Sequence, residues 1–194
     1  MSCNAELFDR VVFEATFTDV KITKADYAQL DKITKLALMI YENGDIQYLQ
    51  KMVQKLPEIY DTQPERLVPL CKDLIKKCDT LISNLEILEE EFKHRGDLAG
   101  YKKNVKGMQI IQLIGTLIIV AVSSLLQLEI PFIAAGGSVY NAFFISKNQM
   151  MDAKDMDIYK AYKKIKKEDP LTLCQTNIAN LKIMRRNLRL LISS

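Results

Sequence analysis

The chain has 194 residues, a formal net charge of +3 and 48% hydrophobic residues, enough for one domain of ordinary size. The modest charge, with no aromatic residues interleaved among basic ones, argues against nucleic acid as a partner. Four scattered cysteines are too few for a disulfide framework in a chain of this length. Glu6, Asp9 and Arg10 stand where a signal peptide needs an apolar run, so no secretory signal is visible.

Sequence motifs of catalysis and cofactor binding are not visible in this chain. It contains no nucleophile elbow, phosphate-binding glycine loop, zinc-protease motif or dinucleotide fingerprint. His94 is the single histidine and has no nearby cysteine pair with which to form a metal site. We therefore expect a protein that is not an enzyme and that uses no cofactor, metal or small-molecule substrate.

The N-terminal third of the chain predicts helices. Residues 4–22 mix helical and strand-like periodicity, and we interpret them as a helix followed by extended chain. Residues 23–26 resemble a capping box, after which apolar residues recur at helical spacing, so this helix should end at Asn43 and Gly44. An amphipathic segment over residues 45–56 follows, and Pro57 is expected to end it.

Residues 62–65 form a second capping box and begin the most regular pattern in the chain. Apolar residues then alternate at spacings of four and three, which is a heptad repeat. This heptad seam consists of Leu67, Cys71, Leu74, Cys78, Leu81, Leu85, Leu88 and Phe92. It predicts a long, coiled-coil-like helix that ends near Gly96 and packs at a shallow angle on a partner helix, in the same chain or another copy. Residues 98–107 should then form a glycine-punctuated joint.

Residues 108–146 carry a single formal charge, that of Glu129. As a helix, the uncharged residues 108–128 would be about 31 Å long, which matches the hydrocarbon core of a bilayer. Residues 130–146 are a shorter second arm, and Pro131 predicts a bend between the two. We therefore predict an apolar helical hairpin, in which the notable residues are Met108, Ile111, Leu117, Val120, Leu125, Glu129, Pro131, Gly136, Gly137 and Phe143.

Lysines flank this hairpin on both sides, whereas the bend between its arms has no cation. By the positive-inside tendency, both long flanking segments, and with them both termini, should face the cytoplasm. The hairpin thus predicts a lipid bilayer as partner and a membrane-associated location. A helix that is apolar all round can equally be buried in the core of a soluble protein, so both interpretations stay open.

The first arm also carries polar side chains at helical spacing. Gln112, Thr116, Ser123 and Gln127 are four, seven and four residues apart and share one helical face, the polar stripe. In lipid, such side chains seek hydrogen-bonding partners in neighbouring helices or in water. The stripe therefore predicts either a seam between helices, including those of other copies, or the lining of a pore.

Two further helices are expected after the hairpin. Residues 148–168 form a charged segment with an apolar stripe that ends at Asp169 and Pro170, and residues 171–192 are apolar on one side. This last helix is the natural partner for the heptad seam. The predicted fold is all-α, a helical bundle with a long coiled-coil-like helix and an apolar hairpin, divided into residues 1–107, 108–146 and 147–194.

This order of long helices, apolar hairpin and further long helices resembles that of the α-helical pore-forming toxins. It resembles equally the small membrane proteins that carry coiled-coil segments beside their spans. The expected function is that of a non-enzymatic membrane protein which inserts its hairpin into a bilayer and self-associates, with pore formation as one outcome. The alternative is a soluble all-α interaction or scaffold module that uses the hairpin as its core and binds a helical protein partner.

Overall fold

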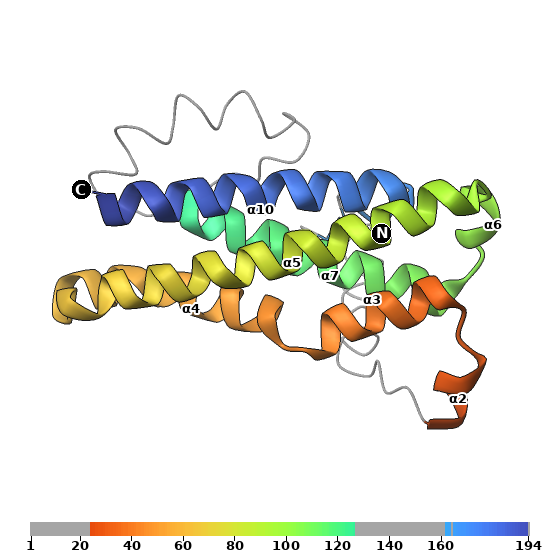
Figure 1. The fold of residues 1–194 in the computed structure, drawn as a ribbon, viewed down its shortest axis with the longest axis horizontal. Helices are drawn as coiled ribbons and strands as arrows, with labels where there is room; N and C mark the ends of the chain where they lie inside the picture. Colours follow the sequence, from red (N-terminus) through yellow and green to blue (C-terminus); the bar gives the residue numbers. More distant parts are fainter. Residues whose placement is uncertain (1–23, 127–161, 164, 194) are drawn as a thin grey trace, which may run out of the picture.

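The computed structural model describes residues 24–126, 162–163 and 165–193, and within these ranges the regular structure is helical throughout. The prediction of an all-α fold is therefore confirmed. The elements are α2 (Lys24–Gln29), α3 (Lys32–Glu42), α4 (Asp45–Thr62), the short 3₁₀ helix η1 (Pro64–Arg66), α5 (Leu67–Arg95), α6 (Leu98–Tyr101), α7 (Val105–Leu126) and α10 (Pro170–Ser193). Figure 1 shows the long helices lying side by side along one axis.

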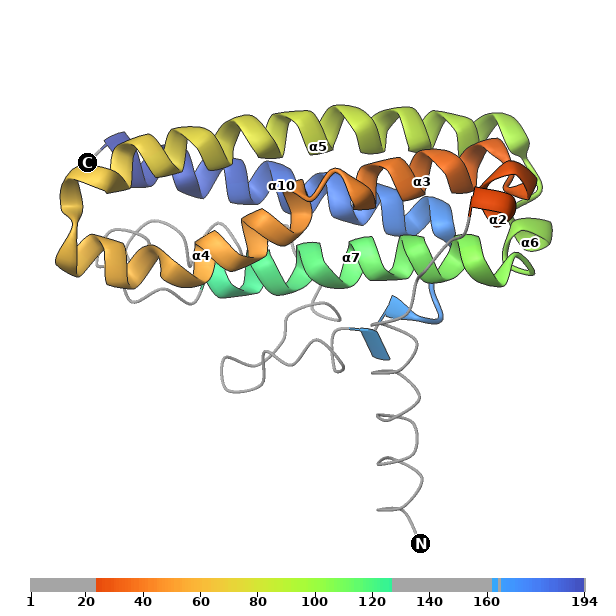
Figure 2. The same cartoon turned by 90° about the horizontal axis from the view of Figure 1, so that it is seen from below.

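The long helices form a four-cornered bundle in which α3 and α4 together occupy one corner (Figure 2). Helix α10 packs on both α5 and α7, and the pair α3–α4 also packs on both. Helices α5 and α7 thus stand at opposite corners. Figure 2 also shows α7 and α10 running in the same direction, with α5 antiparallel to them. Helix α7 ends and α10 begins at opposite ends of the bundle.

The long helix α5 buries its apolar face against α10. All eight residues of the heptad seam are buried, and α10 is the helix with which α5 makes its most extensive contact. Residues of α10 that face this core include Cys174, Leu181 and Leu188. The partner expected for the seam is therefore the last helix of the same chain.

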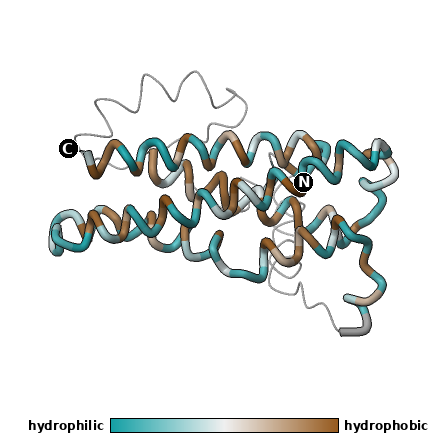
Figure 3. The backbone as a smooth tube through the Cα atoms, in the orientation of Figure 1, coloured by the Kyte–Doolittle hydropathy of each residue, from teal (hydrophilic) through white to brown (hydrophobic). Residues whose placement is uncertain are grey.

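Charged side chains on the outer edges of α5 and α10 pair across the interface. Arg185 Nη1 lies 2.5 Å from Asp79 Oδ1, and Lys182 Nζ lies 3.3 Å from Glu86 Oε1. Figure 3 shows that hydrophilic and hydrophobic residues alternate along both helices. These exposed pairs are worth little stability individually, but their order along the two helices is consistent only with antiparallel packing.

The single helix expected over residues 23–43 is wrong, because the chain breaks between α2 and α3. Asp31 caps α3: its side chain accepts a hydrogen bond of 2.9 Å from the amide of Thr34. An aspartate at this position satisfies a free amide of the new helix and so favours a fresh start over continuation. The predicted end at Asn43 and Gly44 is confirmed, since Gly44 has a φ of 79°, a left-handed conformation that suits glycine.

The expected end of the next helix at Pro57 is also wrong. Helix α4 continues through Pro57 to Thr62, although proline lacks the amide that would bond to the carbonyl four residues earlier. Val53 and Leu56 are fully buried beside Pro57, and α4 packs on both α5 and α7. Tertiary packing along this helix thus compensates for the missing hydrogen bond.

The capping box expected at residues 62–65 does not form. Thr62 instead donates its hydroxyl back to the Glu58 carbonyl, and η1 leads into α5 without a side-chain cap. The predicted end of α5 is confirmed, because Gly96 adopts a left-handed φ of 68° and donates its amide to the Phe92 carbonyl. The joint expected over residues 98–107 contains the short helix α6 and the first turn of α7.

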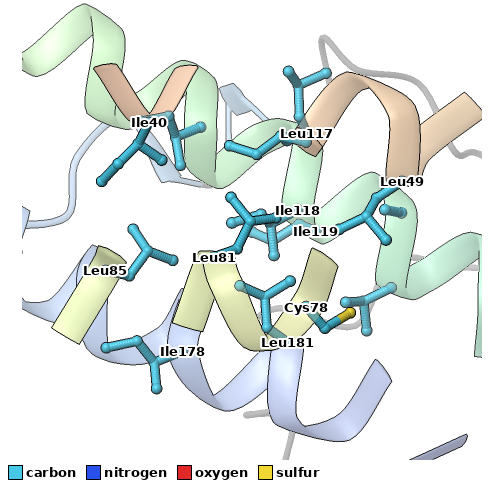
Figure 4. Packing of buried hydrophobic residues seen from close by; sticks show 14 of the residues in the cluster. Ile40, Leu49, Cys78, Leu81, Leu85, Leu117, Ile118, Ile119, Ile178 and Leu181 are labelled. Atoms are coloured by element: carbon cyan, nitrogen blue, oxygen red, sulfur yellow. The ribbon is translucent and has the colours of Figure 1, made fainter. Parts of the chain in front are cut away.

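Helix α10 starts with a strong cap. Asp169 accepts hydrogen bonds from the Thr172 amide at 2.9 Å and the Thr172 hydroxyl at 2.5 Å, while Pro170 occupies the first helical position. Most of the helix expected over residues 148–168 lies outside the described residues. Buried side chains from all the long helices belong to one hydrophobic cluster, which α7 joins from its own corner (Figure 4).

Candidate functional site: the apolar helix α7

Helix α7 contains the first arm of the predicted hairpin. Its residues 107–126 carry no formal charge, and a helix of that length is about 30 Å long. Among the described helices, α7 alone combines the length and apolar composition needed to cross a membrane. Of its most apolar window, 89% is buried inside the protein, and the core helix of a soluble protein has the same properties. Length and composition therefore leave both interpretations of α7 open.

The apolar side chains of α7 are buried from Met108 to Leu125. Met108, Ile111, Leu117, Val120 and Leu125 are all buried, with Val120 only 1% exposed. Figure 4 shows Ile118 and Ile119 of α7 meeting Leu81 of α5 and Leu181 of α10 in the centre of the bundle. The other predicted hairpin residues, Glu129, Pro131, Gly136, Gly137 and Phe143, lie outside the described residues.

Gly115 of α7 lies against Asn177 of α10. A Cβ atom built on Gly115 would lie 3.0 Å from Asn177 Nδ2 and 3.2 Å from Ile165 Cδ1. Both distances are tighter than ordinary contacts, so a larger residue at this position would push α10 away. The lack of a side chain at Gly115 thus sets the spacing between the two helices.

Two members of the polar stripe satisfy their hydrogen bonds within this chain. The Thr116 hydroxyl donates to the Gln112 carbonyl at 2.7 Å, and Gln112 Nε2 donates to the Lys166 carbonyl at 3.0 Å. Both side chains are buried, whereas Ser123 is half-buried. Gln127 lies outside the described residues. In this structure the start of the stripe therefore attaches α7 to the segment before α10, and a lumen lined by the stripe stays a prediction.

A partly buried polar cluster holds the beginning of α7 against α3. It consists of Asp31, Thr34, Tyr101 and Asn104. The Thr34 and Tyr101 hydroxyls lie 3.0 Å apart, and Asn104 Nδ2 donates to Asp31 Oδ2 at 2.6 Å. Asn104 also accepts a hydrogen bond of 3.0 Å from the amide of Gly107, one of the otherwise unpaired amides at the start of the helix.

Tyr101 is the most enclosed member of this cluster. Its ring meets Phe92 edge to face, with centroids 5.0 Å apart, and Arg95 lies over its face at 5.1 Å. Burial raises the pKa of Tyr101 to about 12, so the hydroxyl stays protonated and available for hydrogen bonding at neutral pH. A side chain at Gly107 would collide with this hydroxyl, which explains why α7 needs a glycine in its first turn.

Helix α10 buries three asparagines, Asn177, Asn180 and Asn187. Asn187 donates to the Ile183 carbonyl at 2.9 Å, whereas Asn177 Oδ1 is buried without a hydrogen-bonding partner. An unsatisfied buried amide oxygen reduces stability by about 1 to 3 kcal/mol. Asn177 therefore packs closely on α7, but its side-chain oxygen accepts no hydrogen bond there.

The described part of the chain offers little for catalysis. Its three cysteines are free and buried, and burial raises the pKa of Cys71 to about 11 and those of Cys78 and Cys174 to about 12, which suits inert core thiols. No cluster of three potential metal-ligating side chains occurs among the described residues. His94 is exposed, with its Nδ1 2.7 Å from the Glu90 carbonyl oxygen.

A shallow depression of about 420 Å³ lies beside the polar cluster. It is lined by Asp31, Lys32, Ile33, Glu91, His94 and Arg95. Lys32 and Glu91 already pair across it at 2.6 Å, and Asp31 is engaged in capping α3. This depression is therefore a charged surface hollow and lacks the features of a substrate pocket.

Sequence reasoning missed the residues that position α7. Gly107, Gly115, Tyr101 and Asn104 are separated in sequence from the α3 and α10 residues that they meet, so no local pattern could pair them. One signal was available, since Asn177 and two further asparagines are buried among the apolar residues of the last helix. It could identify a polar contact in the core without naming its partner. No protein-family model, curated protein sequence or solved structure matches this chain.

Proposed function

We propose that this protein is a non-enzymatic helical bundle that stores a membrane-length apolar helix in its core and delivers it into a lipid bilayer. The observation that carries the proposal is α7 itself. Its uncharged residues 107–126 would span a bilayer, and amphipathic helices cover it on the sides where α3, α4 and α10 pack. The proposed location is a membrane surface, with the lysine-flanked ends of the hairpin on the cytoplasmic side.

One feature of the packing of α7 supports a helix that can move from the protein core into a membrane. Its contacts with α10 and with the segment just before α10 include a glycine facing Asn177 and one side chain to main chain hydrogen bond, from Gln112 to Lys166. Neither contact is an ion pair. In a membrane, small residues and hydrogen-bonding side chains such as these pack equally well against another apolar helix. Self-association through the polar stripe is therefore part of the proposal.

A second candidate function is that of a soluble interaction or scaffold module. The observation in its favour is that the polar cluster, Gln112 and Thr116 are all hydrogen-bonded inside the chain, so α7 suits its place in the core. In that case α7 never leaves the bundle. The two functions differ in a single measurable event, which is the separation of α7 from α10.

A reversible disulfide between α7 and α10 tests that event. Gly115→Cys with Asn177→Cys, in a Cys3→Ser background, places two thiols at positions that face each other, since a Cβ on Gly115 would lie 3.0 Å from Asn177 Nδ2. The measurement is resistance of liposome-bound protein to alkaline extraction, with and without reductant. We expect the reduced protein to insert and the oxidised protein to be extracted.

The matched control is Asn177→Cys alone, which cannot form the bond and should respond in the same way with and without reductant. Mass spectrometry confirms the disulfide, and the denaturation midpoint of the reduced variant confirms its fold. Insertion of the oxidised protein at the level of the reduced one would exclude release of α7 from α10. If the parent protein is always extracted, the scaffold function is the correct one.

A further inference from the structure

Two lysine-rich segments far apart in the sequence meet at the end of the bundle where α7 begins. Lys102, Lys103 and Lys106 flank the start of α7, and Lys163, Lys166 and Lys167 precede α10. The hydrogen bond from Gln112 to the Lys166 carbonyl holds the second segment along the early turns of α7. Figure 2 shows the segment just before α10 on the α7 side of the bundle. We call these six residues the lysine surface.

The pKa of Asp169 agrees with the contact between the two segments that the hydrogen bond from Gln112 to the Lys166 carbonyl establishes. Burial alone would raise the pKa of this carboxyl, but hydrogen bonds from Thr172 and the nearby charge of Lys102 bring the pKa below its usual value. Lys102 and Asp169 are separated by more than sixty positions in the chain. The lysine surface is therefore a product of the tertiary fold and not of a single basic run.

The charges of this surface are largely uncompensated. All six lysines are exposed, and among the described residues Lys102, Lys103, Lys166 and Lys167 form no ion pair. Lys106 is paired loosely with Asp26, at 3.4 Å. The acidic residues beside these lysines are Asp97, which caps α6, Asp169, which caps α10, and the half-buried Glu168. The surface thus presents positive charge outward.

An apolar side chain lies within this cationic surface. Val105, the first residue of α7, is 65% exposed and stands between Lys103 and Lys106. Lysines around an exposed aliphatic residue suit a lipid interface, where ammonium groups meet phosphates and the apolar group enters the headgroup boundary. No aromatic platform for stacking bases accompanies the lysines, which argues against nucleic acid as the occupant.

We propose that the lysine surface docks this end of the bundle on an anionic lipid bilayer, with Val105 touching the headgroup boundary and the start of α7 held at the membrane. This inference rests on the proposed membrane function and names its partner as an anionic bilayer. Docking concentrates charge where α7 begins, so the uncharged residues 107–126 are adjacent to the lipid into which they would move. Docking itself requires no change in the bundle.

The test compares two full-length variants with equal changes in charge. The first carries Lys102→Gln, Lys103→Gln, Lys166→Gln and Lys167→Gln. The control carries Lys51→Gln, Lys55→Gln, Lys72→Gln and Lys76→Gln, which replace exposed lysines of α4 and α5 away from the lysine surface. Flotation with vesicles of phosphatidylcholine, alone or mixed with phosphatidylserine, measures binding at low and high salt.

We expect the parent and the control to bind mixed vesicles, with binding that falls as the salt concentration rises. The affinity of the lysine-surface variant for the same vesicles should be lower by roughly tenfold or more. Parental binding by that variant would overturn the inference, as would equal binding of the parent to neutral and mixed vesicles. Variants changed at Lys102 and Lys103 alone, or Lys166 and Lys167 alone, should show intermediate losses. Circular dichroism confirms that each is folded.

Alkaline extraction of the same samples separates the two proposals. Salt-sensitive binding to mixed vesicles without any extraction-resistant protein would leave docking standing and exclude insertion. Extraction-resistant protein from the lysine-surface variant, at the parental level, would leave insertion standing and exclude a role for this surface. Preferential capture by duplex DNA over mixed vesicles, at equal phosphate concentration, would replace the bilayer with nucleic acid and overturn the inference.

Discussion

Helices α5 and α7 stand at opposite corners of the same bundle, yet they meet their surroundings in different ways. Helix α5 buries one heptad face and exposes charged side chains such as Glu86 and Lys72 elsewhere. Helix α7 buries seventeen of its twenty-two residues, including Gln112 and Thr116. An amphipathic pattern identifies which face of a helix is buried, whereas a helix that is apolar all round has no preferred face to identify.

This difference lies in what each helix requires of its surroundings. The seam of α5 needs one partner, and α10 supplies it in the same chain. Helix α7 can be satisfied by protein or by lipid, because both surround apolar side chains without competing for hydrogen bonds. The comparison teaches that the amphipathic helices require the bundle to bury their apolar faces. Helix α7, by contrast, has a composition that suits either a protein core or lipid.

The largest effect should come from a charge placed on α7. Val120 is 1% exposed, so Val120→Arg would bury an unpaired guanidinium and lower the free energy of unfolding by about 3 to 5 kcal/mol. Ile87→Arg is the control on α5, where the side chain is 51% exposed and the change should stay within about 0.5 kcal/mol. Chemical denaturation measures both. A Val120→Arg protein as stable as its parent would mean that α7 lies outside the core in solution.

A smaller effect is expected from a cavity in the seam. Leu81 is fully buried between α5 and α10, so Leu81→Ala should lower the free energy of unfolding by about 2 to 5 kcal/mol. Ile87→Ala, on the exposed side of the same helix, is the matched control for the loss of an aliphatic side chain. Similar denaturation midpoints for the two variants would contradict the packing of α5 on α10.

The smallest effect is the pH dependence contributed by the three buried thiols, two in the heptad seam and one on α10. Burial raises the pKa of Cys71 to about 11 and those of Cys78 and Cys174 to about 12, above the ordinary value of 9.0. Their contribution to stability is therefore complete below about pH 9 and is lost as the pH rises through the folded values, at up to about 1.4 kcal/mol per pH unit for each thiol.

Unfolding measured between neutral pH and about pH 11 in parent and Cys78→Ala protein tests this contribution. The alanine variant should be less stable at neutral pH, because a core atom is lost, and should lose stability less steeply with rising pH. Identical slopes in the two proteins would mean that water reaches the interface between α5 and α10. The pH dependence of stability thus reports whether water reaches these thiols between α5 and α10.

The sequence predicted much of the fold because those parts depend on local rules. The heptad spacing from Leu67 to Phe92 identified a long helix with one buried face, and Gly44 and Gly96 identified helix ends at positions that need a left-handed backbone. The errors arose where distant contacts outweighed local preference. Asp31 restarts a helix and also meets Asn104, while Pro57 is tolerated inside a helix packed on two others.

What the sequence by itself determined is that the chain is all-α, that residues 67–92 need a helical partner, and that the uncharged residues 108–128 are long and apolar enough to cross a bilayer. These properties follow from periodicity and composition, which depend only on the order of residues in the chain. Only the tertiary structure decided that α10 is the partner, that Gly115 lies against Asn177, and that lysines from two distant segments share one surface beside Val105. Such pairings depend on how whole helices align in space, and side chains of similar chemistry elsewhere in the chain would have satisfied the same local rules.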